Sequence, residues 1–527
     1  MADPTPTSSD VPLPKPEASH AAGPVTSRNG TTLPPYNTTY YFNQLIDHNN
    51  PQLGTFKQRF WHTYEFYEPG GPIILFTPGE INADGYEGYL TNTRYLTNTT
   101  INGQFAQELN GSTIVIEHRF FGFSNPLPDL SVKSLQLQTI QQAIDDLEYF
   151  AKNVQLPMPG GSEVAPGKAP WILVGGSYSG ALTSFTMVKY VSSTAVCMQI
   201  VVYIAASISK PGLFQAAYAS SAVVESIVDY WGYFEPIRQY MPQNCSADVE
   251  AVISHIDSTF TSGNTKEINA IKALFNMTDL SHLDDFAGSL RNNLWDWQSL
   301  QPYVGPGALF FNFCDALEVK DGVSAGPDGW GAEHALQAWG SYWTNTYYEL
   351  LCGDDDAEDC LGSYDPTQSY WTNITINNAN RSWNWIVCNE VGFFQEGAPV
   401  GHPTLVTRLV QPPYDERQCV YMFPETFSLS HLPVPNVAKT NQAYDGWNVH
   451  ATRLFFANGH RDPWREATLA ADGTNFTSTA LQPLAIGDGF HCSDLLTRSA
   501  VDPTVLAVQS EALQVMSGWI ASWKPSA

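Results

Sequence analysis

The sequence contains few basic residues. Lys and Arg together number 25 against 52 Asp and Glu, so the formal net charge at pH 7 is −27, and charged residues make up only 15% of the chain. A surface with this excess of negative charge repels nucleic-acid phosphates and anionic lipid, and we therefore expect neither nucleic acid nor a membrane among the partners. The same excess favours solubility in acidic surroundings, where part of the charge is neutralised.

The sequence also lacks the short motifs of metal, nucleotide and redox chemistry. It has no HExxH, no P-loop and no GxGxxG that opens a helix, and we expect neither a metal nor a cofactor. Its 8 cysteines form no CxxC pair, so neither a zinc knuckle nor a thioredoxin-type redox site is indicated. The Glu-His-Arg segment at 117–119 follows an apolar run directly, which indicates a structural His rather than a metal ligand.

Many asparagines, by contrast, begin Asn-X-Ser/Thr triplets without proline at X: Asn29, Asn37, Asn98, Asn110, Asn244, Asn276, Asn373, Asn380 and Asn475. Their number favours a glycosylated, disulfide-bearing protein that is secreted or delivered to a lysosome or vacuole; a cytosolic protein with buried thiols is the alternative. The first residues, Met1-Ala-Asp-Pro-Thr-Pro, show neither the basic nor the apolar region of a signal peptide. We expect that a leader was removed and a Met added, or that the gene start is misassigned.

The 527 residues exceed one ordinary domain, and their texture divides them into four parts. Residues 1–36, rich in Pro, Ser, Thr and Ala, are expected to form a disordered or pro-segment tail. In 37–223, short apolar runs alternate with a helical stretch, which predicts βαβ units and a mostly parallel sheet with flanking helices. Residues 224–430 show helical patterns and most of the cysteines, and are predicted to be an inserted, mainly helical cap domain. Apolar runs return in 431–527, before an amphipathic C-terminal helix. The predicted strands include 72–76, 113–116, 171–174, 453–457 and 484–486; the predicted helices include 135–154, 181–190 and 503–523.

The segment 171–180 carries the most informative pattern. An apolar strand runs into Gly-Gly-Ser-Tyr-Ser-Gly and then a helix, which is typical of a nucleophile elbow, where a strained turn lifts a serine Oγ above the carboxyl edge of the sheet. Small residues are needed at the second position on either side of the nucleophile. For Ser177 these positions are occupied by Gly175 and Ser179, and Ser177 is the better candidate. For Ser179 they are occupied by Ser177 and Ala181, which makes Ser179 a second choice. A plain glycine-rich turn is the alternative interpretation.

The partners of a catalytic serine follow in the chain order that an α/β-hydrolase requires, Ser, acid, His. An apolar run at 454–457 ends in a loop that carries Asp462, and His491 is the only His beyond it. His491 would accept the Ser177 proton, and Asp462 would fix its tautomer. Asp462 could instead cap a turn before Pro463, and other histidines could compete as the base: His431, His450 and His460.

An oxyanion hole is expected beside the elbow. In this fold it uses the amide after the nucleophile, here Tyr178, and an amide from the loop after an early strand, here 76–80. Gly79 and Glu80 both remain candidates for the second donor.

At these residues the chain resembles the Pro-X carboxypeptidase / dipeptidyl-peptidase II family of serine peptidases. The resemblance covers nearly everything from residue 40 onward, through the segments 42–48, 55–61, 116–122, 175–178, 458–464 and 489–491. Within the family the chain is most similar to the fungal acid prolyl endopeptidases, through 76–80, 84–90 and 490–494.

The resemblance implies a peptidase that cleaves proline-containing peptides or proteins on the carboxyl side of proline, at acidic pH and through an acyl-enzyme. It puts Ser177, Asp462 and His491 at the triad positions and Trp464 at a wall of the proline pocket. It also puts Glu80 on the oxyanion-side loop, where aminopeptidase members meet a substrate amine. Endo- or exopeptidase action stays open, and we expect a monomer or homodimer. An esterase or lipase on the same triad, and an inactive homologue that binds peptide or glycan, are the alternatives.

Two further expectations follow from the resemblance. Cys388 and Cys419 should form a disulfide, and Cys492 should remain an unpaired buried thiol. Acid activity requires a neutral His491, but burial lowers its pKa while Asp462 raises it, and the sequence leaves this balance open.

The stretch 191–210 does not belong to the family's pattern. Residues 191–209 hold no charge and approach the length of a membrane span, but a span there would separate the elbow helix from its sheet, and we reject it. The stretch begins with Val191, whose codon starts GT, and ends with Lys210, whose codon can be AAG. We therefore interpret it as a short in-frame intron translated by mistake; a genuine apolar hairpin or helix packed on the core is the alternative.

Deleting residues 191–210 should leave folding and activity intact or improved, because a translated intron contributes no core contacts. Removing a genuine core element would instead cost several kcal/mol of stability, seen as a lower unfolding temperature. Sequencing the cDNA gives an independent result, since a mature transcript that encodes the whole stretch would contradict the intron.

Overall fold

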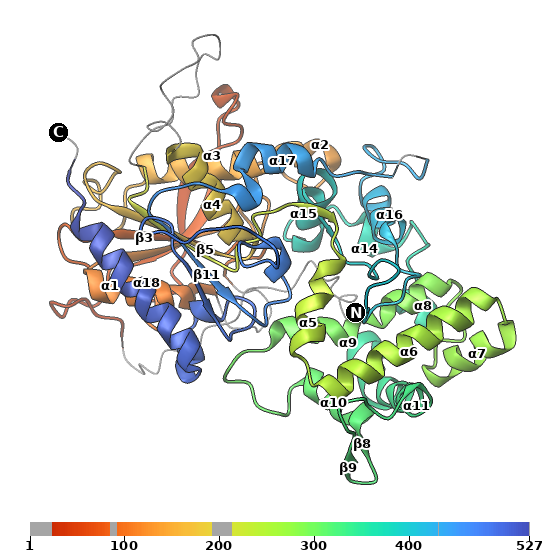
Figure 1. Cartoon of the computed structure of the whole chain (residues 1–527). Helices are drawn as coiled ribbons and strands as arrows, with labels where there is room; N and C mark the ends of the chain where they lie inside the picture. The colour runs from red at the N-terminus through yellow and green to blue at the C-terminus, as the bar shows by residue number, and fades with distance from the viewer. Residues whose placement is uncertain (1–23, 85–91, 192–212, 431, 526–527) are drawn as a thin grey trace, which may run out of the picture.

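The computed structural model describes residues 24–84, 92–191, 213–430 and 432–525. Its centre is an 8-stranded sheet with the strand order β1-β2-β4-β3-β5-β6-β11-β12 (Figure 1). The strands are β1 (Tyr40–Leu45), β2 (Thr55–Thr63), β3 (Ile73–Thr77), β4 (Ser112–Ile116), β5 (Trp171–Gly176), β6 (Ala216–Ser220), β11 (Leu454–Gly459) and β12 (Leu484–Gly487). β2 pairs antiparallel with β1 and with β4, and the other neighbours are parallel. This mostly parallel sheet with flanking helices is an α/β-hydrolase fold and confirms the predicted fold class.

Helices cover both faces of the sheet. One face is covered by α3 (Ile140–Asn153), α4 (Tyr178–Val191) and α17 (Val437–Tyr444), and the other by α1 (Ile101–Leu109) and α18 (Pro503–Ala521), as Figure 1 shows. Successive side chains of a strand point to opposite faces, so Ile73 and Leu75 of β3 join one hydrophobic cluster while Ile74 and Phe76 join the other. Burial on both faces explains why the central strands are continuous apolar runs rather than alternating ones.

Local signals in the sequence set where these helices begin. The side chain of Thr139 accepts a hydrogen bond from the Gln142 amide and caps α3, and Asp502 caps α18 ahead of Pro503. The short helix α2 (Val132–Leu135) precedes α3 and begins at Ser131 in the same way. Because these caps and the apolar stripe of α3 are local, the predicted helices at 135–154 and 503–523 lie close to the observed bounds.

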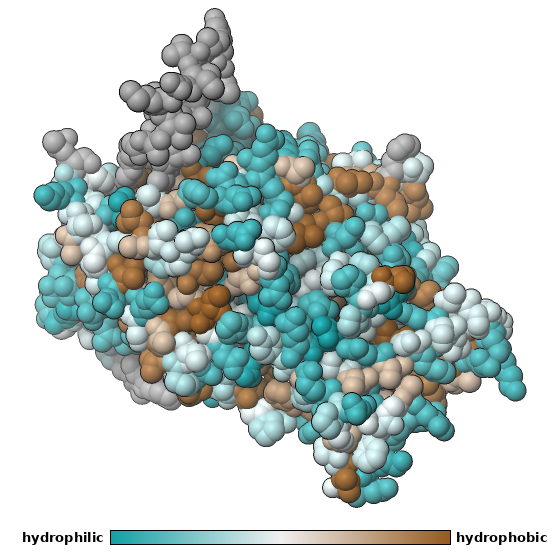
Figure 2. Space-filling model, viewed as in Figure 1, coloured by the Kyte–Doolittle hydropathy of each residue, from teal (hydrophilic) through white to brown (hydrophobic). Residues whose placement is uncertain are grey.

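The cap domain lies to one side of the core and is mainly helical (Figure 1). Its helices are α5 (Phe234–Tyr240), α6 (Gln243–Ser262), α7 (Thr265–Leu274), α8 (Leu283–Ser289), α9 (Arg291–Trp295), α10 (Leu309–Glu318), α11 (Ala332–Tyr342), α12 (Tyr348–Cys352), α13 (Ala357–Leu361), α14 (Ser369–Thr372), α15 (Ala379–Ile386) and α16 (Pro412–Met422). At its base β7 (Ile227–Asp229) pairs in parallel with β10 (Gly392–Phe394), so two cap segments that are far apart in the sequence lie side by side. A hairpin of β8 (Val319–Lys320) and β9 (Val323–Ser324) projects from the cap and carries exposed valines (Figures 1 and 2).

Disulfides hold the cap together. Cys245 is joined to Cys314, Cys352 to Cys360 and Cys388 to Cys419, with Cα–Cα distances of 5.4, 5.6 and 5.8 Å. The structure thus forms the 388–419 pair that the resemblance implies. Cys492 is a free buried thiol, and Cys197 lies outside the described residues.

The tail predicted at 1–36 is shorter than expected. Residues 24–36 lie against the core: Leu33 is only 5% exposed, the Tyr36 hydroxyl donates to Glu65 at 2.6 Å, and Arg28 donates to the Gln107 carbonyl at 2.7 Å. The composition of the segment, which is poor in apolar residues, does not predict these contacts. They are made by a few isolated side chains whose partners are distant in sequence. The prediction of disorder is therefore wrong for 24–36, and residues 1–23 lie outside the described part of the chain. So does most of the predicted insertion, since α4 ends at Val191 and the description resumes at residue 213.

Carboxylates gather where β10 and α16 meet. Burial raises the pKa of Glu396 to about 9, the negative charges of Asp229 and Asp415 add to this shift, and the Arg291 guanidinium opposes it. Glu396 is 4% exposed, and its Oε2 has no hydrogen-bond partner. A carboxyl whose pKa rises on folding, here from 4.5, contributes its full stability below 4.5 and loses it as the pH rises toward 9.

Replacing Glu396 by Gln should therefore raise the unfolding temperature at neutral and alkaline pH. We expect a rise of about 2 °C or more near pH 8 and no change near pH 4, where the carboxyl is already neutral. Thermal unfolding at both pH values measures this, and Glu511→Gln, at an exposed position on α18, serves as the control. An equal shift at both pH values would show that the effect is not the titration of Glu396.

Candidate active site

Ser177 occupies the turn between β5 and α4 with a left-handed backbone, at φ 58°. This conformation is unfavourable for a residue with a Cβ and persists only where neighbouring structure holds it. Here the Ser177 amide donates to the Ser220 carbonyl of β6 at 2.9 Å, and the Ser177 carbonyl accepts from the Ala181 amide at 2.9 Å. The segment thus has the backbone geometry of a nucleophile elbow.

Close packing around the turn distinguishes Ser177 from Ser179. A Cβ at Gly175 would lie 2.1 Å from the Ser179 carbonyl oxygen, and one at Gly79 would lie 2.5 Å from the Ser179 Oγ. Ser179 is therefore enclosed between β5 and the loop after β3, and it is 0% exposed. Ser177 is 8% exposed and lines a pocket, so Ser177 is the serine that a substrate can reach.

His491 and Asp462 lie together although a strand and a long loop separate them in the sequence. His491 Nδ1 is 2.9 Å from Asp462 Oδ1, which also accepts the Trp464 amide at 2.9 Å. The two loops leave the neighbouring parallel strands β11 and β12 at the same sheet edge, where the Arg461 amide donates to the Gly489 carbonyl at 3.0 Å. The other ring nitrogen of His491, Nε2, is buried without a hydrogen-bond partner. The structure thus brings the predicted acid and base together and leaves one ring nitrogen free.

The electrostatics of this pair favour a charged imidazole. Burial of the ring lowers the pKa of His491, but the Asp462 carboxylate raises it more, so that the pKa lies well above 6.5. The balance that the sequence left open therefore falls on the side of Asp462.

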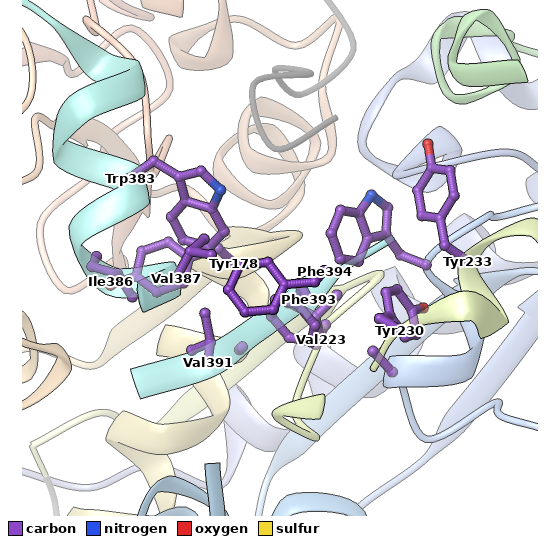
Figure 3. Packing of buried hydrophobic residues seen from close by; sticks show 14 of the residues in the cluster. Tyr178, Val223, Tyr230, Tyr233, Trp383, Ile386, Val387, Val391, Phe393 and Phe394 are labelled. Carbon is purple, nitrogen blue, oxygen red and sulfur yellow. The ribbon is translucent and has the colours of Figure 1, made fainter. Parts of the chain in front are cut away.

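A small pocket lies beside Ser177. Core and cap both contribute to its lining, which consists of Glu80, Ser177, Tyr178, Val223, Gln298, Trp383, Phe393 and Trp464. Trp464 stacks on Tyr230 at a centroid distance of 5.4 Å and meets Phe393 edge-on at 5.3 Å. In Figure 3, Trp383 and Phe393 stand on the cap side of Tyr178. Phe393 itself has a left-handed backbone, at φ 68°.

Glu80 brings a carboxyl group to this pocket. Burial raises its pKa to about 7, against the lowering effects of its own backbone amide and of His491. Gly79, directly before it, has φ 80°, which turns the loop toward the elbow. Tyr178 opens α4, so its amide is one of the free donors of that helix N-terminus. Gly79 and Glu80 stay equal candidates for the second oxyanion donor.

The cap segment that holds the Asp and His loops in place has no signature in the sequence. The 3₁₀ turn η5 (Asp296–Ser299) contains Trp297, which donates from Nε1 to the Arg461 carbonyl at 2.7 Å. Gln298 accepts the Trp464 Nε1–H at 2.8 Å, and Gln301 donates to the His491 carbonyl at 3.0 Å. These contacts join residues far apart in sequence, and no motif or periodicity marks them.

The competing histidines are placed elsewhere. His450 and His460 lie exposed at the surface, and His431 is outside the described residues. His118 is buried, its Nε2 lies 3.2 Å from the Tyr178 hydroxyl, and burial lowers its pKa to about 4. Its neighbours Glu117 and Arg119 form ion pairs within the core, with Arg59 and Asp146, so the 117–119 segment is structural as predicted.

Three further features bear on glycosylation, membrane association and metal binding. The sequon asparagines are exposed at positions 29, 37, 98, 276, 373 and 475 and partly exposed at 110, 244 and 380. In the part of the chain that the structure describes, no helix has both the length and the apolarity to cross a membrane. Within the same residues, no cluster of His, Cys, Asp and Glu side chains suits a metal ion.

Comparisons with known proteins identify the family of this chain. The sequence model of the family described as serine carboxypeptidase S28 matches residues 44–197 and 204–513. The serine protease vicPa of Bipolaris victoriae is 34% identical, over 91% of this chain and 88% of its own. A probable extracellular serine carboxypeptidase of Arthroderma benhamiae is 31% identical, over 83% of this chain and 59% of its own. The lysosomal Pro-X carboxypeptidase of Homo sapiens is 25% identical, over 95% of this chain and 92% of its own. Among solved structures, a proline iminopeptidase of Mycobacterium smegmatis is 12% identical with a TM-score of 0.36, covering 91% of this chain and 100% of that one.

Between residues 44 and 513 the family match leaves out only 198–203. It includes 191–197 and 204–210, so most of the stretch that we expected to lie outside the family's pattern is matched. It otherwise spans the sheet, the cap and the loops that carry Ser177, Asp462 and His491. The chain therefore belongs to the serine carboxypeptidase S28 family and is a serine peptidase.

Proposed function

We propose that this peptidase cleaves peptides on the carboxyl side of proline, with Ser177 as nucleophile, His491 as base and Asp462 as the group that orients it. The observation that carries the proposal is the pocket beside Ser177, whose walls are the flat side chains of Trp383, Phe393 and Trp464. A pyrrolidine ring is compact and apolar, and aromatic faces bind such a ring well. The name of the human relative, a Pro-X carboxypeptidase, supports the same specificity.

The chemistry follows from the geometry. Ser177 Oγ attacks the carbonyl carbon of the P1 proline while His491 Nε2, which has no other partner, takes the hydroxyl proton. Asp462 holds the proton on Nδ1 and stabilises the imidazolium that forms. The Tyr178 amide, with that of Gly79 or Glu80, stabilises the oxyanion. His491 then protonates the leaving amine, and water releases the acyl-enzyme by the same steps.

The compartment is part of the proposal. Relatives are named extracellular and lysosomal, and the cap carries three disulfides, which persist in oxidising environments. None of the sequon asparagines is buried, so all can present a side chain to glycosylation. We propose a secreted or lysosomal glycoprotein.

Wild-type enzyme should hydrolyse Z-Gly-Pro-p-nitroanilide and cut proline-rich peptides after proline, as mass spectrometry would show. Ser177→Ala should abolish this activity and fluorophosphonate labelling, leaving on the order of 10³–10⁴-fold residual acceleration over water. Ser179→Ala is the matched control and should cost little, because the Ser179 Oγ is buried without a partner. Hydrolysis of short acyl esters alone would indicate an esterase. Loss of activity in Ser179→Ala, with activity kept in Ser177→Ala, would show that Ser179 is the nucleophile.

Two groups at the site shape the pH dependence in opposite directions. A charged Glu80 in the pocket would repel the developing oxyanion, and burial raises its pKa to about 7, so the carboxyl is neutral only on the acidic side. His491 must be neutral to accept the serine proton, and its raised pKa works against activity at low pH. We propose that activity is lost on the alkaline side because Glu80 must be protonated.

The kcat/KM of the wild type should therefore fall as the pH rises through about 7. The Glu80→Gln variant should stay active to a pH about one unit higher than the wild type does, because the amide remains neutral. Glu390→Gln is the matched control, since burial also raises the pKa of Glu390 to about 7 but that residue does not line the pocket. A wild-type profile that begins to rise only above pH 6.5 would contradict acid activity.

A further inference from the structure

A second cavity adjoins the pocket beside Ser177. It is also small, and its lining consists of Arg291, Trp295, Trp383, Asn384, Val387, Phe393, Phe394, Gln395, Asp415, Gln418 and Trp464. Trp383, Phe393 and Trp464 line both spaces, whereas Ser177, Tyr178 and Glu80 line only the first. The second cavity therefore lies beyond the aromatic walls, on the side away from the nucleophile.

Its lining contains buried polar atoms without hydrogen-bond partners: Trp383 Nε1, Asn384 Oδ1 and Gln395 Nε2. The two amide side chains have fixed orientations. Gln395 Oε1 accepts the Trp295 Nε1–H at 2.8 Å, and Asn384 Nδ2 donates to the Asn380 carbonyl at 3.0 Å. The residues of the lining therefore hold two N–H donors and one C=O acceptor without partners, each of which costs about 1–3 kcal/mol while it stays buried and unpaired.

The charged groups in the lining are already matched. Arg291 binds Asp415 through two hydrogen bonds, of 2.8 and 3.0 Å, and also donates to the Gln395 carbonyl at 2.7 Å. Because the guanidinium and carboxylate neutralise each other, the unpaired groups that remain are all neutral. The cavity thus favours a neutral hydroxyl or amide over an acid or an amine.

We propose that this cavity is an extension of the proline pocket that receives the hydroxyl group of 4-hydroxyproline, so that the enzyme cleaves after hydroxyproline as well as after proline. The inference rests on the proposed function. When the carbonyl carbon of the P1 residue is at Ser177, ring carbon C4 points away from the nucleophile, toward the walls that both spaces share. A hydroxyl group both donates and accepts, which matches the unpaired N–H and C=O groups.

The wild-type enzyme tests this directly. The kcat/KM for Z-Gly-Hyp-p-nitroanilide should lie within about 3-fold of that for the Pro substrate, whereas an apolar pocket discriminates against an added hydroxyl by about 100-fold. Cleavage of the Pro substrate with a deficit of about 100-fold on the Hyp substrate would overturn this inference and leave the proposed function standing. Cleavage of neither substrate would overturn both.

A variant at Gln395 locates the effect. Gln395→Met keeps the size of the side chain but removes the free N–H, and with it the oxygen that accepts from Trp295. It should lower kcat/KM for the Hyp substrate by about 3–10-fold, the value of one neutral hydrogen bond. The Pro substrate should be unaffected, because Gln395 does not line the pocket beside Ser177. Gln411→Met, at an exposed amide outside the cavity, should change neither substrate. An equal loss on both substrates would show that Gln395 does not meet the hydroxyl, and the wild-type comparison holds even if the variant fails to fold.

Discussion

The site depends on the left-handed backbone of Ser177. That conformation is unfavourable by itself, and it exists because β6 lies directly beside β5 and supplies the Ser220 carbonyl to the Ser177 amide. The same close approach admits only small residues around the turn, such as Gly175. Since β11 and β12 run parallel to β5 and β6, their loops end at the same edge of the sheet and bring Asp462 and His491 to it. Sheet topology therefore brings the proposed catalytic residues to one edge of the sheet, and the strained turn exposes Ser177 rather than Ser179.

The cap contributes as much to the site as the core does. Trp297, Gln298 and Gln301 hold the loops of Asp462, Trp464 and His491 through side-chain hydrogen bonds. Trp383 and Phe393 supply pocket walls that the core lacks. Because the disulfides all lie in the cap, they stiffen the part of the molecule that would otherwise be free to shift against the sheet.

The features that the sequence predicted are those that depend on local pattern. The central strands are short apolar runs, the elbow is a contiguous motif, and the fold's fixed chain order points from Ser177 to Asp462 and His491. The residues it missed act through contacts across the fold. Gln301 meets the His491 carbonyl and Phe393 packs edge-on against Trp464, yet neither lies in a motif. Leu33, Tyr36 and Arg28 likewise find partners in the core, within a segment whose composition indicated disorder. The pKa of His491 was equally out of reach, because burial and the Asp462 carboxylate act on it in opposite directions.

The parallel pairing of β7 with β10 joins the start of the cap to a segment much later in the sequence. Because the two strands hold each other in place, the helices between them can change in length and sequence without moving either strand. Phe393, however, is part of β10 and also a wall of both cavities. This strand of the cap therefore also helps to set the width of both cavities. Substitutions in the cap can change that width, and with it the side chains that fit, while the turn at Ser177 stays the same.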